Sequence, residues 1–258
     1  MNFEPSISVV IPVRDGESFV PSAMDSILAQ EYRNLEVLLI DDGSTDGLAN
    51  RLKHCPAFVR YIRQDQKGQA AARNRGIQES TGDLIAFLDI DDLWTNRHLR
   101  TLVHSLEEHP EAGIAQGMMR QFWIAPGGRY YGTEPYRGPY LGSCLFRRTV
   151  FRQCGLFDES MPYGEDTDLF FRCWENDVVK VHVQEVSLLY RRHPQNTSRG
   201  RNGAAYLLVM KRRIERIKVG VSDSTAQRRH AFQHYIGHHK PLGELPLREV
   251  SECDLRSA

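Results

Sequence analysis

The chain has 258 residues, with 33 lysines and arginines balanced by 33 aspartates and glutamates. This length suits one large α/β domain, alone or with a small extension. The balanced charge argues against a protein that binds nucleic acid through bulk positive charge. Five scattered cysteines form no close metal-binding pair, so we expect reduced thiols and a cytoplasmic location. No apolar run is long enough to span a bilayer, and the first residues lack a signal-peptide pattern.

The first half of the chain alternates between strand-like and helix-like patterns. Short apolar runs predict buried strands at residues 7–12, 36–41, 59–62 and 84–89. Amphipathic spacing predicts helices at residues 20–28, 69–80 and 99–106. This order predicts a mostly parallel sheet with helices on both faces. Ligands of such sheets bind beyond the carboxyl ends of the strands, so we expect a crevice there.

The strand expected at 84–89 leads into a cluster of carboxylates, Asp89, Asp91 and Asp92. Continued alternation would place Asp89 and Asp91 on one side and Asp92 on the other. Two adjacent carboxylates repel each other unless a cation lies between them. Oxygen ligands favour Mg²⁺ or Mn²⁺ over zinc. The alternative is a polar loop in which Asp92 caps the next helix.

The loop after the first expected strand, residues 12–17, contains a single glycine. The chain shows neither the Gly-x-Gly-x-x-Gly pattern of dinucleotide-binding folds nor a Gly-Lys-Ser/Thr phosphate loop. Phosphates are therefore not held by backbone amides alone, and a metal held by carboxylates suits that task better.

Four segments in this order resemble the family 2 glycosyltransferases of the GT-A fold. They are residues 7–12, the Asp41-Asp42-Gly43-Ser44 motif, the Ala-Arg73-Asn74-x-Gly76 motif and residues 87–92. The resemblance runs from about residue 7 to about residue 195. It implies a Rossmann-like nucleotide-diphospho-sugar transferase fold.

The resemblance also implies a donor site. Asp42 is expected to contact the nucleotide base, and Arg73 to lie near the nucleotide. Asp89 and Asp91 are expected to bind the ribose and the metal on the diphosphate. The loop after the first strand adds the nucleotide-binding candidates Pro12, Val13 and Arg14, although Arg14-Asp15 replaces the family's common Tyr-Asn. The alternatives are a turn-capping role for Asp42 and a solvated helical position for Arg73.

The second half is expected to bind the acceptor. Residues 113–123 predict a strand pair, and residues 129–139 a long loop. Four tyrosines there either stack on a sugar ring or simply order the loop: Tyr130, Tyr131, Tyr136 and Tyr140.

A helical pattern begins after Tyr163-Gly164-Glu165-Asp166. Carboxylates at a helix start suit the macrodipole, which is one explanation for this cluster. The family resemblance implies a different role, in which Asp166 is the catalytic base. Glu165, Asp166 and Tyr163 are then the acceptor-binding candidates.

The chemistry requires one base and no acid. A diphosphate leaving group is stabilised by the metal, while the acceptor hydroxyl must lose its proton as it attacks. Direct displacement inverts the anomeric centre. A late strand is expected at 179–190, followed by His193, which by resemblance approaches the metal or diphosphate.

Residues 204–219 predict an amphipathic helix with several basic residues. Such a helix can lie on anionic lipid, or it can pack on its own domain or on a partner. The His-rich tail after residue 221 is interpreted as an extension and not as a metal site. We expect a transferase domain at 1–200, divided near residue 110 into nucleotide-sugar and acceptor halves, and a helical extension at 201–258.

The sequence thus predicts an inverting, Mn²⁺- or Mg²⁺-dependent glycosyltransferase that uses a nucleotide sugar, with a UDP-sugar favoured. The acceptor is expected to be a saccharide, a lipid-linked molecule or a peptide, in cell-surface polysaccharide or glycoconjugate synthesis. The Gln-x-x-Arg-Trp motif of processive synthases is absent, which favours transfer of single sugars. The alternatives are an inactive sugar-nucleotide-binding scaffold and a nucleotidyltransferase, whose lysine-containing phosphate loop is missing.

Overall fold

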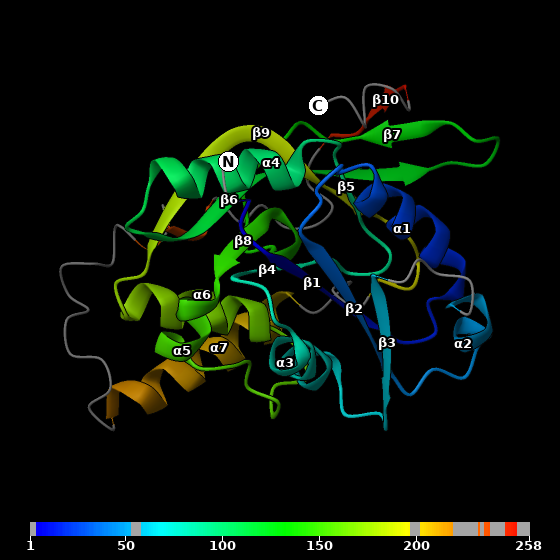
Figure 1. Ribbon diagram of the computed structural model, residues 1–258. Coiled ribbons are helices and arrows are strands. Elements are labelled where there is room, and N and C mark those ends of the chain that lie inside the picture. The colour runs from blue at the N-terminus through cyan, green and yellow to red at the C-terminus, as the bar shows by residue number, and fades with distance from the viewer. Residues whose placement is uncertain are drawn as a thin grey trace.

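The computed structural model describes residues 4–52, 58–196, 202–218, 232, 235–237 and 246–251. These residues form an α/β fold in which a curled ten-stranded sheet lies between two layers of helices (Figure 1). Four parallel strands at one side of the sheet carry the first half of the chain.

The first half follows the predicted alternation. Its elements are β1 (Ile7–Val13), α1 (Val20–Leu28), β2 (Leu35–Asp42), the short α2 (Leu48–Arg51), β3 (Val59–Gln64), α3 (Gln69–Glu79) and β4 (Leu84–Phe87). Pro12 does not end β1 as expected, because the strand continues to Val13. The pairing of β1 with β4 stops at Val10, so from there onward only β2 flanks the proline. This position tolerates a residue that cannot donate a ladder hydrogen bond.

The second half makes the sheet mixed instead of mostly parallel. Its elements are β5 (Leu93–Trp94), α4 (His98–Glu108), β6 (Ala112–Ile124), β7 (Tyr130–Gly132), β8 (Cys144–Arg147), α5 (Arg148–Cys154), α6 (Glu165–Glu175), β9 (Val179–Arg191), α7 (Asn202–Lys218) and β10 (Arg248–Val250). β8 lies antiparallel to both β4 and β6. The expected strand pair at 113–123 is wrong, since these residues form the single long strand β6. The expected loop at 129–139 contains the short strand β7.

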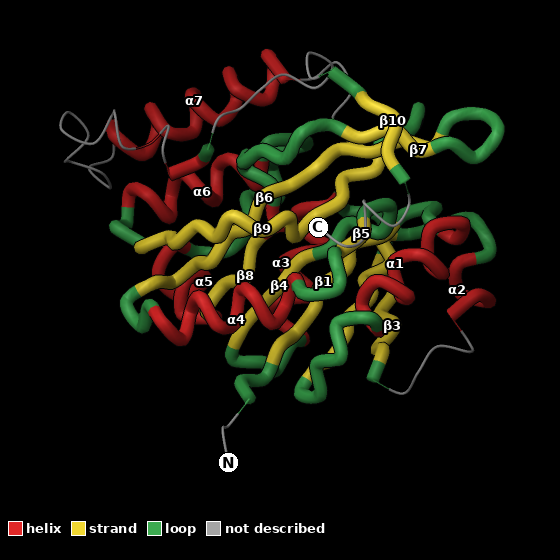
Figure 2. The backbone as a smooth tube through the Cα atoms, turned by 90° about the horizontal axis from the view of Figure 1, so that it is seen from above, coloured by secondary structure: helices red, strands yellow, loops and turns green. Residues whose placement is uncertain are grey.

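Side-chain alternation along β1 explains the two helical layers. Val9 and Ile11 join a core cluster with α1 and α4, whereas Val10 joins another with α3, α5 and α6. The view from above shows helices on both sides of the strands (Figure 2). The sheet is therefore covered on both faces, as its continuous apolar strands require.

Gly76 lets α3 approach β1 very closely. A Cβ atom at this position would lie 2.2 Å from Cγ1 of Val10. The glycine of the Ala-Arg-Asn-x-Gly motif thus has a packing role, because it sets the distance between α3 and β1.

The C-terminal elements pack onto the rest of the fold. α7 lies beside α6 in both views (Figures 1 and 2). β10 pairs with β7, so residues 248–250 form a strand within the region expected to be helical. The His-rich stretch interpreted as an extension lies mostly outside the described residues. No described helix is both long and apolar enough to cross a bilayer.

Candidate active site

The loops after β1 and β2 are hydrogen-bonded to each other at the carboxyl edge of the sheet. The Asp15 carboxylate accepts a hydrogen bond from the Thr45 backbone amide at 2.6 Å. In return, the Asp15 amide donates to the Ser44 hydroxyl at 2.9 Å. Pro12 and Val13 are buried beneath these loops, and Arg14 is exposed at their rim.

The two aspartates that end β2 have different partners. Asp41 is fully buried and accepts hydrogen bonds from the Tyr61 hydroxyl at 2.5 Å and from Arg63 at 2.7 Å. Asp42 accepts from the backbone amides of Lys67 and Gly68, each at 2.8 Å. The Asp42 carboxylate therefore orders the loop that leads from β3 into α3.

The Asp-x-Asp segment is a turn and not a continued strand. β4 ends at Phe87, and the Asp92 amide donates to the Asp89 carbonyl at 2.9 Å. The expectation that strand alternation places Asp89 and Asp91 on one side and Asp92 on the other is therefore wrong.

Asp92 also does not cap the next helix, which was its alternative role. Asp92 accepts a hydrogen bond from the Arg191 backbone amide at 2.9 Å and is buried, which raises the pKa of its carboxyl well above its usual value.

His193 reaches the Asp-x-Asp turn from the end of β9. Its Nε2 atom lies 2.8 Å from Oδ2 of Asp91. The Asn196 side chain contacts the same carboxylate oxygen at 3.3 Å. Burial and the nearby Asp89 carboxylate raise the pKa of Asp91. The structure thus brings together Asp91 and His193, two of the three metal-binding candidates.

Arg73 connects the donor-side and acceptor-side candidates. Its Nη2 atom lies 2.8 Å from the Asp89 carboxylate, and its Nη1 atom lies 2.5 Å from the Glu165 carboxylate. Arg73 is only 4% exposed, so the alternative of a solvated helical arginine is wrong. Its guanidinium also lies over the Phe157 ring, 5.7 Å from the centroid.

Asp166 lies in the first turn of α6, directly after Glu165. Gly164 precedes the helix with a φ of +80°, a conformation that glycine adopts without strain. The Asp166 carboxylate accepts a hydrogen bond from the Thr167 amide at 2.6 Å. Burial and repulsion by Glu165 raise the pKa of Asp166 to about 7, although Arg73 acts in the opposite direction. Tyr163, the remaining acceptor-side candidate, is half-buried just before this helix.

Asn74 fixes the segment that leads to α6. Its side-chain amide donates to the Phe157 carbonyl at 2.9 Å and to the Glu159 carboxylate at 2.8 Å. Its carbonyl oxygen accepts from the Phe157 amide at 2.9 Å. Asn74 and Arg73, adjacent on α3, therefore both tie this helix to residues 157–165.

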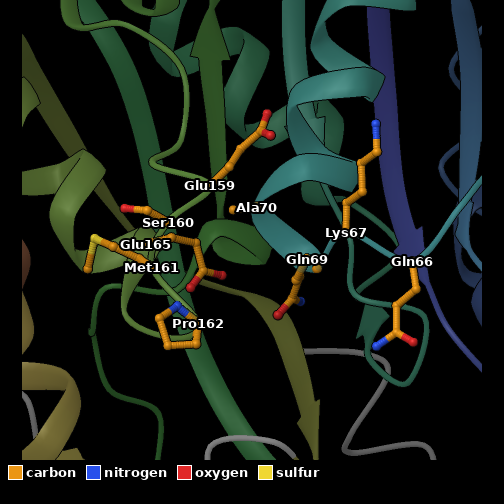
Figure 3. A pocket seen from close by; sticks show the side chains of 10 residues that line it. Gln66, Lys67, Gln69, Ala70, Glu159, Ser160, Met161, Pro162 and Glu165 are labelled. Atoms are coloured by element: carbon orange, nitrogen blue, oxygen red, sulfur yellow. The ribbon is translucent and has the colours of Figure 1, made fainter.

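A pocket of about 380 Å³ lies between the start of α3 and the start of α6. Residues 66–70 form one wall, and residues 159–162 with Glu165 form the other (Figure 3). The Gln69 side chain also donates to the Asp89 carboxylate at 3.1 Å. The pocket thus adjoins both ends of the Asp89–Arg73–Glu165 chain, and its amides and carboxylates suit hydroxyl-rich ligands.

Two of the four candidate tyrosines help to order the protein itself. The Tyr136 side chain is buried, and its hydroxyl accepts a hydrogen bond from the Gln121 amide. Tyr131 stacks on Trp123, with 5.1 Å between the ring centroids. These contacts favour the loop-ordering alternative for Tyr131 and Tyr136.

Arg63 and Arg191 are two structural supports of the site, and sequence patterns did not reveal the first. Arg63 binds Asp41, and the Arg191 Nε atom donates to the Asp91 carbonyl at 2.8 Å. Arg63 directly follows the third strand predicted at 59–62, at the edge where the other candidates lie, and this position was the signal that could have identified it. The sequence suggests Arg191 as a residue that assists the diphosphate, but its contact with the Asp91 carbonyl was not visible, because the two residues lie one hundred positions apart in the chain.

Residues 8–155, more than half of the chain, match the family model described as glycosyl transferase family 2. The chain belongs to glycosyl transferase family 2. The resemblance to this family seen in the four motifs is thereby confirmed.

Relatives of this family 2 chain include an uncharacterized glycosyltransferase of Rickettsia typhi. It is 27% identical over 187 residues, which cover 66% of this chain and 59% of the relative. The glycosyltransferase GlyA of Streptococcus pneumoniae is 32% identical over 152 residues, which cover 57% of this chain and 22% of GlyA. The family 2 chain thus spans less than two thirds of the length of either relative.

Solved structures confirm a GT-A type fold. Staphylococcus aureus TarS in complex with UDP is 15% identical, with a TM-score of 0.67 over 88% of this family 2 chain and 69% of the TarS chain. The mannosyltransferase PcManGT of Pyrobaculum calidifontis, in complex with GDP-Man and Mn²⁺, is 16% identical. Its TM-score is 0.70 over 91% of this chain and 69% of the PcManGT chain.

Proposed function

We propose that this family 2 glycosyltransferase transfers a single sugar from a nucleotide-diphosphate sugar, with a UDP-sugar favoured, to an acceptor hydroxyl with inversion. The observation that carries the proposal is the chain of contacts Asp89–Arg73–Glu165, which ends beside Asp166. It joins the donor-side carboxylate of Asp89 to the acceptor-side carboxylate of Glu165.

Asp166 has the properties of a general base. With a pKa of about 7, a substantial fraction of its carboxyl groups is ionised at neutral pH, and the group still binds a proton well. A base whose pKa lies near the working pH is the most effective in removing a proton from a hydroxyl. Glu165, held by Arg73, and Tyr163 would orient the acceptor at the pocket.

The donor would lie across the carboxyl ends of β1, β2 and β4. Its proposed contacts are Pro12, Val13, Arg14, Asp42, Arg73 and Asp89. The loop that Asp42 holds in place forms a wall of the pocket, which supports a donor position between that loop and Asp89.

Asp91, Asp89 and His193 would hold Mn²⁺ or Mg²⁺. Carboxylate oxygens with one imidazole suit Mn²⁺ well. Among the described residues no three or more His, Cys, Asp or Glu side chains are arranged to bind a metal by themselves. Such metals commonly take one or two carboxylates and complete their shell with substrate phosphates and water. When bound, the metal would stabilise the charge on the diphosphate leaving group.

The solved relatives and the cysteines support a proposal for the wider setting. The UDP-bound TarS and the GDP-Man-bound mannosyltransferase share the fold and bind nucleotide donors, while the Mn²⁺ in the second agrees with the proposed cofactor. The buried free thiols Cys144, Cys154 and Cys173 agree with a cytoplasmic location. We propose a role in cell-surface polysaccharide or glycoconjugate synthesis, with a saccharide, lipid-linked molecule or peptide as acceptor. Residues 1–200 would form the transferase domain and residues 201–258 its extension.

The experiment is calorimetric titration of UDP, GDP, CMP and TDP, each with and without Mn²⁺. We expect one diphosphate, with UDP favoured, to bind in a Mn²⁺-dependent manner. Asp91→Ala should lose this dependence, whereas Asp25→Ala, on the exposed side of α1, should keep it. If a folded protein binds none of these nucleotides, the proposal is wrong.

An inactive scaffold of the same fold is the second candidate, and turnover distinguishes it. The wild type should release nucleotide diphosphate from its donor, and Asp166→Asn should bind the donor with unchanged affinity but release none. Tight donor binding without turnover in the wild type, across a panel of sugar acceptors, would favour the scaffold.

A further inference from the structure

The two faces of α7 are arranged opposite to those of an ordinary surface helix. Two of its arginines point toward α6, where Arg216 binds Asp168 at 2.7 Å and Glu175 at 2.9 Å. Arg213 binds the same Glu175 at 3.3 Å. Both carboxylate side chains are at most 3% exposed, so the basic face of α7 is neutralised against the protein.

The solvent-exposed side of α7, its outer face, carries several large apolar side chains. Its large side chains are Tyr206, Leu207, Ile214 and Ile217, between 40% and 70% exposed. Four of the seven large exposed hydrophobic residues of the described chain therefore lie on this helix. Surface helices normally turn their apolar stripe toward the core, and a clustered exposed patch marks an interaction surface.

The charge on the outer face indicates what covers it. Lys211 and Lys218 follow Leu207 and Ile214 at the four-residue spacing that places them on the same side. Both are exposed, and neither forms an ion pair with another described residue. Glu215 is exposed as well, but it binds Arg212 at 3.0 Å. The available charge beside the apolar side chains is thus positive.

A second copy of the chain suits this surface poorly, because two such faces would bring lysines of the same charge together. An anionic membrane suits the outer face of α7 well, because it is apolar in its interior and negatively charged at its surface. A helix lying in a membrane interface places apolar side chains below the headgroups, while its lysines contact anionic lipids.

We propose that the outer face of α7 docks this enzyme onto an anionic lipid bilayer. The helix, about 25 Å long from its 17 residues, lies parallel to the membrane plane. The side facing the protein stays bound to α6 through its arginines.

Docking through α7 would bring the pocket beside the lipid headgroups. Arg212 binds Asp158 at 3.0 Å, and Met161 of the pocket wall packs with Val209. The pocket wall, α6 and α7 thus form one packed unit. Together with the proposed function, this placement selects a lipid-linked molecule from the three acceptor classes; the lipid docking itself does not depend on that function.

The test is flotation of the full chain with vesicles of phosphatidylcholine, with and without phosphatidylglycerol. We expect binding to the anionic vesicles only. The double variant Leu207→Glu with Ile214→Glu should bind at least about tenfold more weakly. Lys211→Gln with Lys218→Gln should lose about thirtyfold in affinity for anionic vesicles.

A matched control places the same charges on other exposed apolar positions. Leu28→Glu with Ile124→Glu should float like the wild type, since these residues are 50% and 45% exposed elsewhere. All variants should bind nucleotide donor equally, which separates this test from that of the proposed function. The proposal is overturned if the wild type does not float, or if it binds neutral vesicles equally well. It is also overturned if the α7 variants lose self-association in sedimentation while they still float.

Discussion

At the scale of single residues, Arg73 joins the two halves of the site. One guanidinium binds the aspartate that follows β4 and the glutamate that begins α6. Its partner Glu165 is almost as buried as Arg73 itself. Removal of one member of a buried ion pair leaves the other charge unpaired and is strongly destabilising.

Arg73→Gln should therefore lower the free energy of unfolding by about 3–5 kcal/mol. Urea denaturation measures this loss. Arg75→Gln is the matched control on the same helix. Arg75 is half-exposed and pairs with Glu79 at the surface, so its loss should cost less than about 1 kcal/mol. If the two variants lose equal stability, the buried ion pairs of Arg73 contribute no more to stability than the surface pair of Arg75.

The pH dependence of turnover should report Asp166. Because its pKa is about 7 and the base must be ionised, kcat/KM should rise about tenfold per pH unit below pH 7 and level off above it. Arg73 lowers this pKa, so Arg73→Gln should move the rising limb to higher pH. Initial rates across the pH range measure both effects. If kcat/KM rises near pH 4 and is level above it, Asp166 does not act as a base with a raised pKa.

At the scale of elements, the distance between α3 and β1 places the motif residues. In an open helix, Gly→Ala stabilises by about 1 kcal/mol. At Gly76 the new methyl group would lie 2.2 Å from Val10, which lies in the middle of the sheet. The strain of such overpacking is about 1–3 kcal/mol and outweighs the gain in helix propensity.

Gly76→Ala should accordingly destabilise the protein, as measured by chemical denaturation. Gln78→Ala, at an exposed position of the same helix, should change stability by no more than about 0.5 kcal/mol. A stabilised Gly76→Ala variant would mean that α3 and β1 lie farther apart than the structure shows.

At the scale of the whole molecule, His98 makes the free energy of unfolding depend on pH. It is 1% exposed and stacks on Trp94 with 4.2 Å between ring centroids. Burial lowers the pKa of His98 from 6.5 to about 3. The unfolded chain thus binds a proton below pH 6.5 that the folded chain excludes. The difference in the His98 pKa between the folded and unfolded chain stabilises the fold fully above pH 6.5. This contribution is lost as the pH falls toward 3.

The wild type should lose about 4–5 kcal/mol more than His98→Phe between pH 7 and pH 3. Urea denaturation at a series of pH values measures the difference. His104→Phe, at a 70% exposed position of the same helix, should follow the wild type. A His98→Phe variant with an unchanged pH profile would show that this histidine is protonated in the folded state.

The sequence by itself determined what depends on neighbours along the chain. Alternating apolar residues such as Val9 and Val10 determine which side chains face each helical layer, and the motif order determines the family. The start of α6 at Glu165 and Asp166 was equally visible, because helical periodicity and the acidic first turn are local. The catalytic role of Asp166 and the metal-binding roles of Asp89, Asp91 and His193 stay predictions.

Only the tertiary structure decided the features that depend on distant partners. β8 lies antiparallel between β4 and β6, since strand direction depends on which edges remain to be paired and not on local pattern. His193 reaches Asp91 because β9 ends beside the Asp-x-Asp turn. The amphipathic pattern of α7 shows that its two faces differ. Buried Asp168 and Glu175 decide that the arginines meet the protein, since buried carboxylates require a cationic partner and leave the apolar side chains outside.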